Sequence, residues 1–329
     1  MIIGIFRVNR PFTPILLIIL AVLLWLDGFI FHANVLLPET HTAPLYGPIA
    51  RLFNQYTFLN VLLSFVFVML QAFMLNRIIT DKNLTERNSF LPALMYIVFM
   101  SGYIGFMGLQ PALFANFFLI LALDKIFEVF NEEAVHVEIF NVGFFIALAG
   151  LFYLPALPLF LLLIVSLILY FVAGMRSLVA SLMGFAVPFI FTFLYYFWFD
   201  RTEEWLQIYS EMWNIGGGLP EDLTAFGWIS MILFLLLGLI SVLKLYLGVL
   251  PDRPVRIRKR FQVLLAYLFI AFLPVFIIVL ENVNWQMILL LPFSVILAGF
   301  FQENKNNRVN NIIFLFIILA IVAGKIAGE

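Results

Sequence analysis

Cysteine is absent from the 329-residue sequence, and histidine occurs only three times. Without cysteine the chain forms no disulfides, thiolate metal sites, iron–sulfur clusters or c-type haem attachments. Three histidines also leave little basis for a haem or copper enzyme. We therefore expect no metal site and no cofactor.

Charge is equally scarce. Acidic and basic residues make up 11% of the chain, less than half of the roughly 25% found in soluble domains, while 64% of the residues are hydrophobic. So few charges cannot coat a water-facing surface, and the composition predicts an integral membrane protein. The 18 basic and 19 acidic residues nearly balance. No basic stripe is available, so nucleic-acid binding is excluded.

Long apolar runs predict an all-α, polytopic transmembrane helix bundle of about eleven spans, because one pass through about 30 Å of hydrocarbon takes about 20 helical residues. The predicted spans are residues 14–32, 57–76, 90–108, 111–127, 139–154, 155–174, 178–199, 226–249, 261–280, 285–301 and 310–326. The apolar runs 89–127 and 139–174 are each too long for one pass. Glycine and proline at 108–111, and proline at 154–155, predict where these runs turn.

The distribution of basic residues predicts how these spans are oriented. If the N-terminus is cytoplasmic, all but three of the basic residues lie on the inner side, as the positive-inside rule requires. The three on the outer side are Arg51, Arg201 and Lys325. We therefore predict a cytoplasmic N-terminus, a C-terminus on the outer side and an odd number of spans.

Residues 1–329 are predicted to form one integral membrane domain, because the longest polar segments, 33–56 and 200–225, are too short to build a core of their own. Both segments lie on the outer side. In the second one, Trp205 and Tyr209 recur at helical spacing, which predicts an amphipathic helix along the membrane surface. Flexible outer segments of this kind can cover a lipid-linked substrate.

The first outer segment and the span before it carry residue types suited to acid–base chemistry. Asp27 lies near the outer end of the first span, and His32, Glu39 and His41 follow it. Poor hydration disfavours the charged form of a carboxylate and suits it to act as a general base. Asp27 or Glu39, assisted by His32 or His41, is therefore a candidate catalytic group. The alternative is that Asp27 only reaches up to the water interface.

Two further charged clusters have structural interpretations. Glu133 and His136 have the Glu-x-x-His spacing of di-metal sites, but no second copy exists, which favours a solvated acidic face. The basic run 253–260 is a topology signal for its span, and it could also attract anionic lipid headgroups. No internal repeat supports a transporter of the inverted-repeat type.

Two resemblances bear on function. The whole chain resembles an uncharacterised family of multi-pass inner-membrane proteins of Gram-negative bacteria, a domain of unknown function. Residues 110–118, 140–144 and 147–151, together with the outer segments 27–56 and 200–225, resemble the scaffold of the GT-C glycosyltransferases.

The resemblances imply a location in the inner membrane, with the C-terminus in the periplasm. Residues 1–225 would form the GT-C-like spans 1 to 7, and residues 226–329 would add spans 8 to 11. Such enzymes take a sugar from a polyprenyl-phosphate carrier on the outer side and carry a catalytic acid in the first outer loop. That loop often shows paired acids, whereas Asp27 and Glu39 are single and separated by eleven residues.

The leading hypothesis is sugar transfer from a polyprenyl-phosphate carrier, with Asp27 or Glu39 as base and with Arg51 and Arg201 holding the phosphate. One alternative is a non-catalytic subunit that packs against a membrane-protein partner, favoured by the scarcity of polar groups and by the 40 phenylalanines. Another is a transporter of a lipid or small solute. The sequence leaves open whether the protein is an enzyme, and membrane lipids are expected partners in each case.

Overall fold

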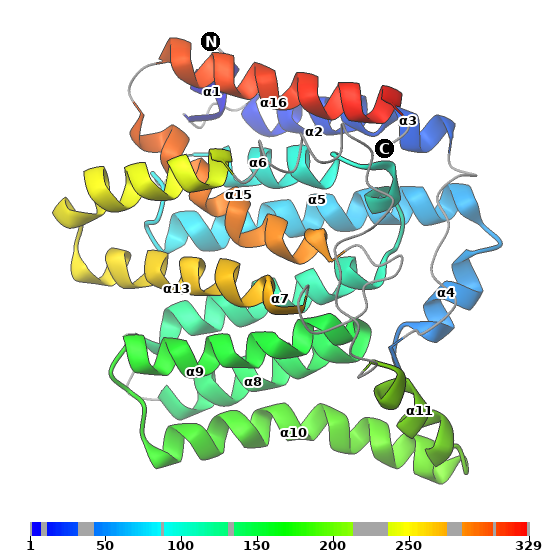
Figure 1. Cartoon of the computed structure of the whole chain (residues 1–329). Coiled ribbons are helices and arrows are strands. Elements are labelled where there is room, and N and C mark those ends of the chain that lie inside the picture. The colour runs from blue at the N-terminus through cyan, green and yellow to red at the C-terminus, as the bar shows by residue number, and fades with distance from the viewer. Residues whose placement is uncertain are drawn as a thin grey trace.

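The structure is a computed structural model that describes residues 2–7, 12–31, 43–86, 89–130, 135–212, 236–274, 285–304 and 307–327. Within these ranges all regular structure is helical, as the sequence predicted, and the helices run mostly along one common direction (Figure 1).

The elements are named here in chain order. They are α1 (Ile2–Arg7), α2 (Thr13–Leu24), α3 (Leu26–Ile30), α4 (Gly47–Phe53), α5 (Thr57–Asp81), α6 (Leu91–Met100), η2 (Ile104–Met107), α7 (Pro111–Val129), α8 (Val135–Phe152), η3 (Leu154–Leu159), α9 (Phe160–Leu169), α10 (Met175–Trp198), α11 (Thr202–Met212), η4 (Leu245–Val249), η5 (Leu250–Asp252), α13 (Val255–Ala271), α15 (Gln286–Glu303) and α16 (Asn307–Ala327).

In the described part of the chain, five helices are long and apolar enough to cross a membrane. They are Thr57–Asp81, Val135–Phe152, Met175–Trp198, Gln286–Glu303 and Arg308–Lys325. This is fewer than the eleven spans predicted, in part because hydropathy counts apolar residues whether or not the helix breaks. The predicted spans 226–249 and 261–280 also extend outside the described residues. Shorter apolar helices lie at Thr13–Leu24, Leu91–Met100, Leu154–Leu169 and Leu236–Gly248.

The chain reverses where glycine and proline predicted it. Gly108 and Gln110 have extended backbone, and α7 starts at Pro111. Likewise α8 ends at Phe152, and the 3-10 turn η3 begins at Leu154, next to Pro155. Proline fits the first turn of a helix because the amide that it lacks would have no partner there.

A break in the α6 pass was not predicted. The α-helix ends at Met100, and the chain continues through η2 to Gly108. Side chains satisfy this irregular backbone: the Ser64 hydroxyl donates to the Gly108 carbonyl (2.8 Å), and the Leu109 amide donates to Asn60 Oδ1 (2.7 Å). An unpaired backbone group in hydrocarbon costs several kcal/mol, so these buried polar side chains make the break possible.

Burial divides the helices into central and peripheral ones. Every residue of α6 is buried, and so is α15 from Met287 to Gln302. In contrast, α10 and α16 expose large apolar side chains, with Trp198 81% and Ile312 68% exposed. A surface of this kind is matched to lipid rather than to water, and the protein is a membrane protein.

Helices α8 and α10 approach each other closely through two glycines. A Cβ atom on Gly184 would lie 2.1 Å from the Phe140 carbonyl oxygen, and one on Gly143 would lie 2.4 Å from the Ser181 carbonyl oxygen. Small residues allow the backbones of membrane helices to meet at such short distances. The contact holds α10, and with it the start of α11, against the rest of the bundle.

The last helix is fastened at both of its ends. At its start, the Ile3 amide donates to Asn311 Oδ1 (3.2 Å), while Arg7 donates to the Asn304 carbonyl (2.9 Å) just after α15. At its far end, the Lys325 ammonium lies beside Asp27. The two chain termini therefore lie at opposite ends of α16 (Figure 1).

Candidate functional site

Two of the predicted site residues, Arg51 and Arg201, line one cleft. Helices α4 and α11 lie near each other at one end of the bundle (Figure 1). The cleft is lined by residues of both helices, and its volume is about 270 Å³. Its walls are formed by Ala43, Pro44, Gly47, Pro48, Arg51, Tyr195, Tyr196, Arg201, Glu204, Gln207 and Ile208.

Arg51 is presented by the short helix α4. The turn before α4 is tied to the end of α8, because the Leu45 amide donates to the Leu151 carbonyl (3.2 Å). Pro48 stands in the first turn of α4, where its fixed backbone favours helix initiation. Ala50 packs inward, and the neighbouring Arg51 is therefore exposed at the mouth of the cleft.

Arg201 is placed by the C-terminal cap of α10. Asp200 has a left-handed backbone (φ 52°), and the Arg201 amide donates back to the Tyr196 carbonyl (2.9 Å). This six-to-one hydrogen bond is the Schellman pattern, which ends a helix and turns the chain sharply. The chain therefore changes direction at Arg201, immediately after the last turn of α10.

Helix α11 then folds back onto α10. The Trp205 ring lies 5.2 Å from the Phe193 ring, and the Tyr209 ring lies 6.2 Å from the Phe189 ring, measured between centroids. Burial raises the pKa of the Tyr209 hydroxyl above its ordinary value, so this phenol stays neutral. The amphipathic helix predicted for this segment is confirmed over Thr202–Met212.

Three charged groups converge on the cleft. The Arg201 Nη2 atom lies 2.6 Å from Glu204 Oε2 and 2.9 Å from Glu204 Oε1. Among the described residues no carboxylate forms an ion pair with Arg51. Tyr196 of α10 lines the same cleft. Two cations and one anion leave the described walls with a formal charge of +1.

Asp27 does not line this cleft. Its carboxylate is paired with the Lys325 ammonium, with Oδ2 at 3.0 Å and Oδ1 at 3.1 Å from Nζ. Lys325 also donates to the Leu24 carbonyl (2.6 Å), at the break between α2 and α3. The Asp27 carboxylate is therefore engaged in an ion pair, whereas the sequence hypothesis needs a carboxylate that can approach the acceptor hydroxyl.

The other predicted site residues, His32, Glu39 and His41, lie outside the described residues. The sequence prediction missed Glu204, which lines the cleft beside Arg201. Glu204 could have been found from its position three residues after Arg201, because this spacing on a helix brings two side chains onto one face.

A second cluster of charges lies far from the cleft, where α5, α7 and α8 meet. Lys82 bridges Glu128 (3.0 Å) and Asp124 (3.3 Å), and Lys125 bridges Glu128 (2.7 Å) and Glu138 (3.2 Å). These contacts pair carboxylates with ammonium groups. No group of three metal-ligating side chains is found within the described ranges.

Buried Arg260 reinforces this end of the bundle. It donates to the Lys82 carbonyl (2.7 Å) and to the Phe127 carbonyl (3.0 Å), near the ends of α5 and α7. Carbonyls at a helix C-terminus have no partner within the helix, and a cation is favoured there. The guanidinium thus acts as a structural cap.

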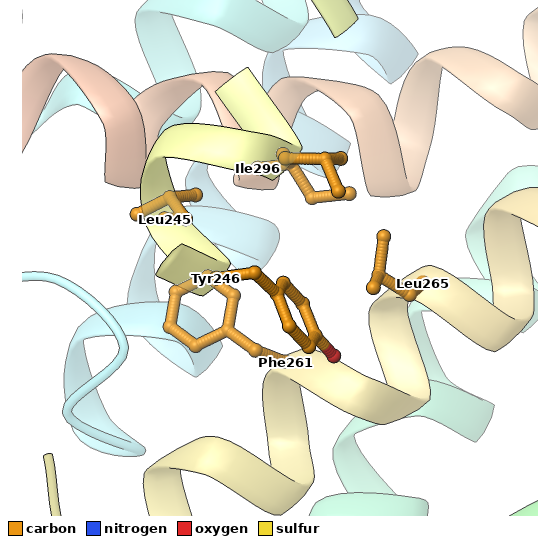
Figure 2. A pocket seen from close by; sticks show the side chains of 6 residues that line it. Leu245, Tyr246, Phe261, Leu265 and Ile296 are labelled. Atoms are coloured by element: carbon orange, nitrogen blue, oxygen red, sulfur yellow. The ribbon is translucent and has the colours of Figure 1, made fainter. Parts of the chain in front are cut away.

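Figure 2 shows an apolar crevice between η4, α13 and α15. It is lined by Val242, Leu245, Tyr246, Phe261, Leu265 and Ile296, and it leaves no room for a water molecule. The crevice is a packing gap, whereas the cleft between α4 and α11 has polar walls and space for a small group.

The fold and the cleft define an all-helical membrane protein with an arginine-lined cleft at one end of its bundle. The chain belongs to a family of unknown function, DUF6427, whose profile matches residues 46–327. No curated protein and no solved structure matches the chain.

Proposed function

We propose that the protein binds the phosphate of a polyprenyl-phosphate-type lipid in the cleft between α4 and α11, on the periplasmic side of the inner membrane. The observation that carries this proposal is that Arg51 and Arg201, which are distant in sequence, line one cleft. Guanidinium groups suit phosphate because their planar donors match its oxygens in pairs.

The exposed apolar surface of α10 favours a lipid phosphate over a soluble phosphate as the ligand of the cleft. Leu194, Phe197 and Trp198 are exposed on the last turns of this helix, close to Tyr195 and Tyr196 of the cleft. A lipid tail could lie along these side chains while its phosphate enters the cleft from the side. Aromatic rings such as Trp198 are favoured at headgroup level.

The periplasmic location belongs to a proposed topology of eleven passes with the N-terminus inside. In this topology the five long helices, α7 and α13 would supply seven passes, and α2 with α3, α6 with η2, η3 with α9, and the helix ending in η4 would supply the other four. The placement of the termini at opposite ends of α16 supports an odd number. The positive-inside rule then assigns the end with Lys82, Arg258 and Arg308 to the cytoplasm.

Sugar transfer from such a carrier is the chemistry that we propose for this site. Transfer requires a base for the acceptor hydroxyl within hydrogen-bond reach. The sequence hypothesis named Asp27 or Glu39 as the base. Because Asp27 is paired with Lys325, we propose Glu39 of the first outer segment for this role. If the arginines prove irrelevant, the non-catalytic subunit and the transporter are the remaining functions.

Binding of farnesyl phosphate to the full chain in detergent micelles tests this proposal. We expect Arg51→Ala and Arg201→Ala each to weaken binding by about tenfold to a hundredfold, because each removes charge-assisted hydrogen bonds that contribute roughly 1.5–3 kcal/mol. Arg77→Ala is the matched control, since Arg77 is exposed and lies at the end of α5 away from the cleft. Unchanged affinity in both cleft variants, measured by titration calorimetry, would overturn the proposal.

A further inference from the structure

The carboxylate in the cleft has no part in holding a phosphate. Glu204 places both of its carboxylate oxygens within 2.9 Å of Arg201 Nη2. It therefore occupies part of the guanidinium edge that an incoming phosphate would use. It lines the same cleft as Arg51. Any anion bound by the two arginines therefore lies near a fixed negative charge.

We propose that Glu204 is a specificity-determining residue that lowers the preference of the cleft for doubly charged phosphates relative to singly charged phosphodiesters. The inference rests on the proposed function, since it describes how the same cleft selects its ligand. It concerns the charge of the headgroup, and Glu204 takes no part in a reaction.

The argument follows from how Coulomb energy depends on ligand charge. Repulsion by one carboxylate is proportional to the charge of the bound anion, so a dianion is repelled twice as strongly as a monoanion at the same place. Affinity depends exponentially on energy. If removal of the Glu204 charge raises monoanion affinity by a certain factor, it raises dianion affinity by about the square of that factor.

The position of Glu204 makes the effect measurable. The side chain is 41% exposed, so water and salt screen the repulsion without abolishing it. For charges about 5 Å apart in a well-hydrated site we expect a factor of about three for a monoanion. The corresponding factor for a dianion is about nine. Tyr195 and Gln207 are neutral and do not alter this ratio.

The test compares two probes with the same tail. Farnesyl phosphate is close to a dianion at pH 8, and its methyl ester is a monoanion. Both are titrated into the full chain, and into Glu204→Gln and Glu203→Gln, in the same detergent at constant ionic strength. Glu203 is the matched control because it is exposed on the same helix and does not line the cleft.

We expect Glu204→Gln to gain about threefold for the diester and about ninefold for the monoester, and Glu203→Gln to gain less than twofold for either. Equal gains for both probes, or no gain, would overturn the inference while leaving the proposed function intact, provided that Arg51→Ala and Arg201→Ala still weaken binding. If neither arginine matters, the proposed function and this inference both fail.

Discussion

At the scale of single residues, the Asp27–Lys325 ion pair has the clearest energetic role. The side chains are 22% and 10% exposed, so removal of one partner leaves the other poorly hydrated and uncompensated. We expect Lys325→Met to lower the free energy of unfolding by about 2 kcal/mol, less than the 3–5 kcal/mol of a fully buried pair. The midpoint of thermal unfolding in detergent measures this loss.

Two further variants make this prediction specific. The exchanged pair Asp27→Lys with Lys325→Asp should recover part of the lost stability, because it restores opposite charges at the same place. Arg77→Met breaks an exposed pair with Asp81, whose side chains are 85% and 60% exposed, and should cost under about 0.5 kcal/mol. A Lys325→Met protein as stable as wild type would show that the pair is energetically irrelevant.

Sequence reasoning selected Asp27 because it lies near the outer end of the first predicted span. It selected Arg51 and Arg201 because they are two of the three basic residues on the predicted outer side. It could not find the partner of Asp27, since Lys325 is 298 residues away and hydropathy carries no information about which spans are neighbours. It also missed Glu204, because six acids in that segment looked equivalent until the cap at Asp200 set the direction of α11.

At the scale of elements, the contact between α8 and α10 is the most sensitive to added volume. A methyl group on Gly184 would overlap the Phe140 carbonyl, and backbone cannot move aside as a flexible side chain can. We expect Gly184→Ala to destabilise the protein by about 2–3 kcal/mol. Gly174→Ala is the control, because nothing lies within 4 Å of its Cβ position. Equal melting temperatures for the two variants would contradict the close packing.

Turns were easier to predict than helix breaks. Proline and glycine mark the reversals at 108–111 and 154–155, because each has a direct effect on the backbone. The helix breaks have distant partners: Lys325 donates to the Leu24 carbonyl between α2 and α3, and Ser64 and Asn60 bind the backbone of Gly108 and Leu109, beyond the break that follows Met100. A span predicted from one stretch of sequence gives no information about these distant partners.

At the scale of the whole molecule, the proposed topology can be tested without removing any native thiol, since the chain has no cysteine. Ser210→Cys lies on exposed α11 and should react from outside intact cells with a membrane-impermeant maleimide. Glu86→Cys, exposed beyond α5, should react only after permeabilisation. If both sites react from the same side, the proposed number of passes or their orientation is wrong.

The Asp27–Lys325 contact also sets an order of events during synthesis. A ribosome adds Asp27 to the chain 298 residues before Lys325, so α3 is synthesised long before its counter-charge. During that interval the carboxylate needs another polar partner, such as water, because an uncompensated charge is costly inside the membrane. Chains that stop before the lysine would therefore lack the contact between α3 and the end of α16.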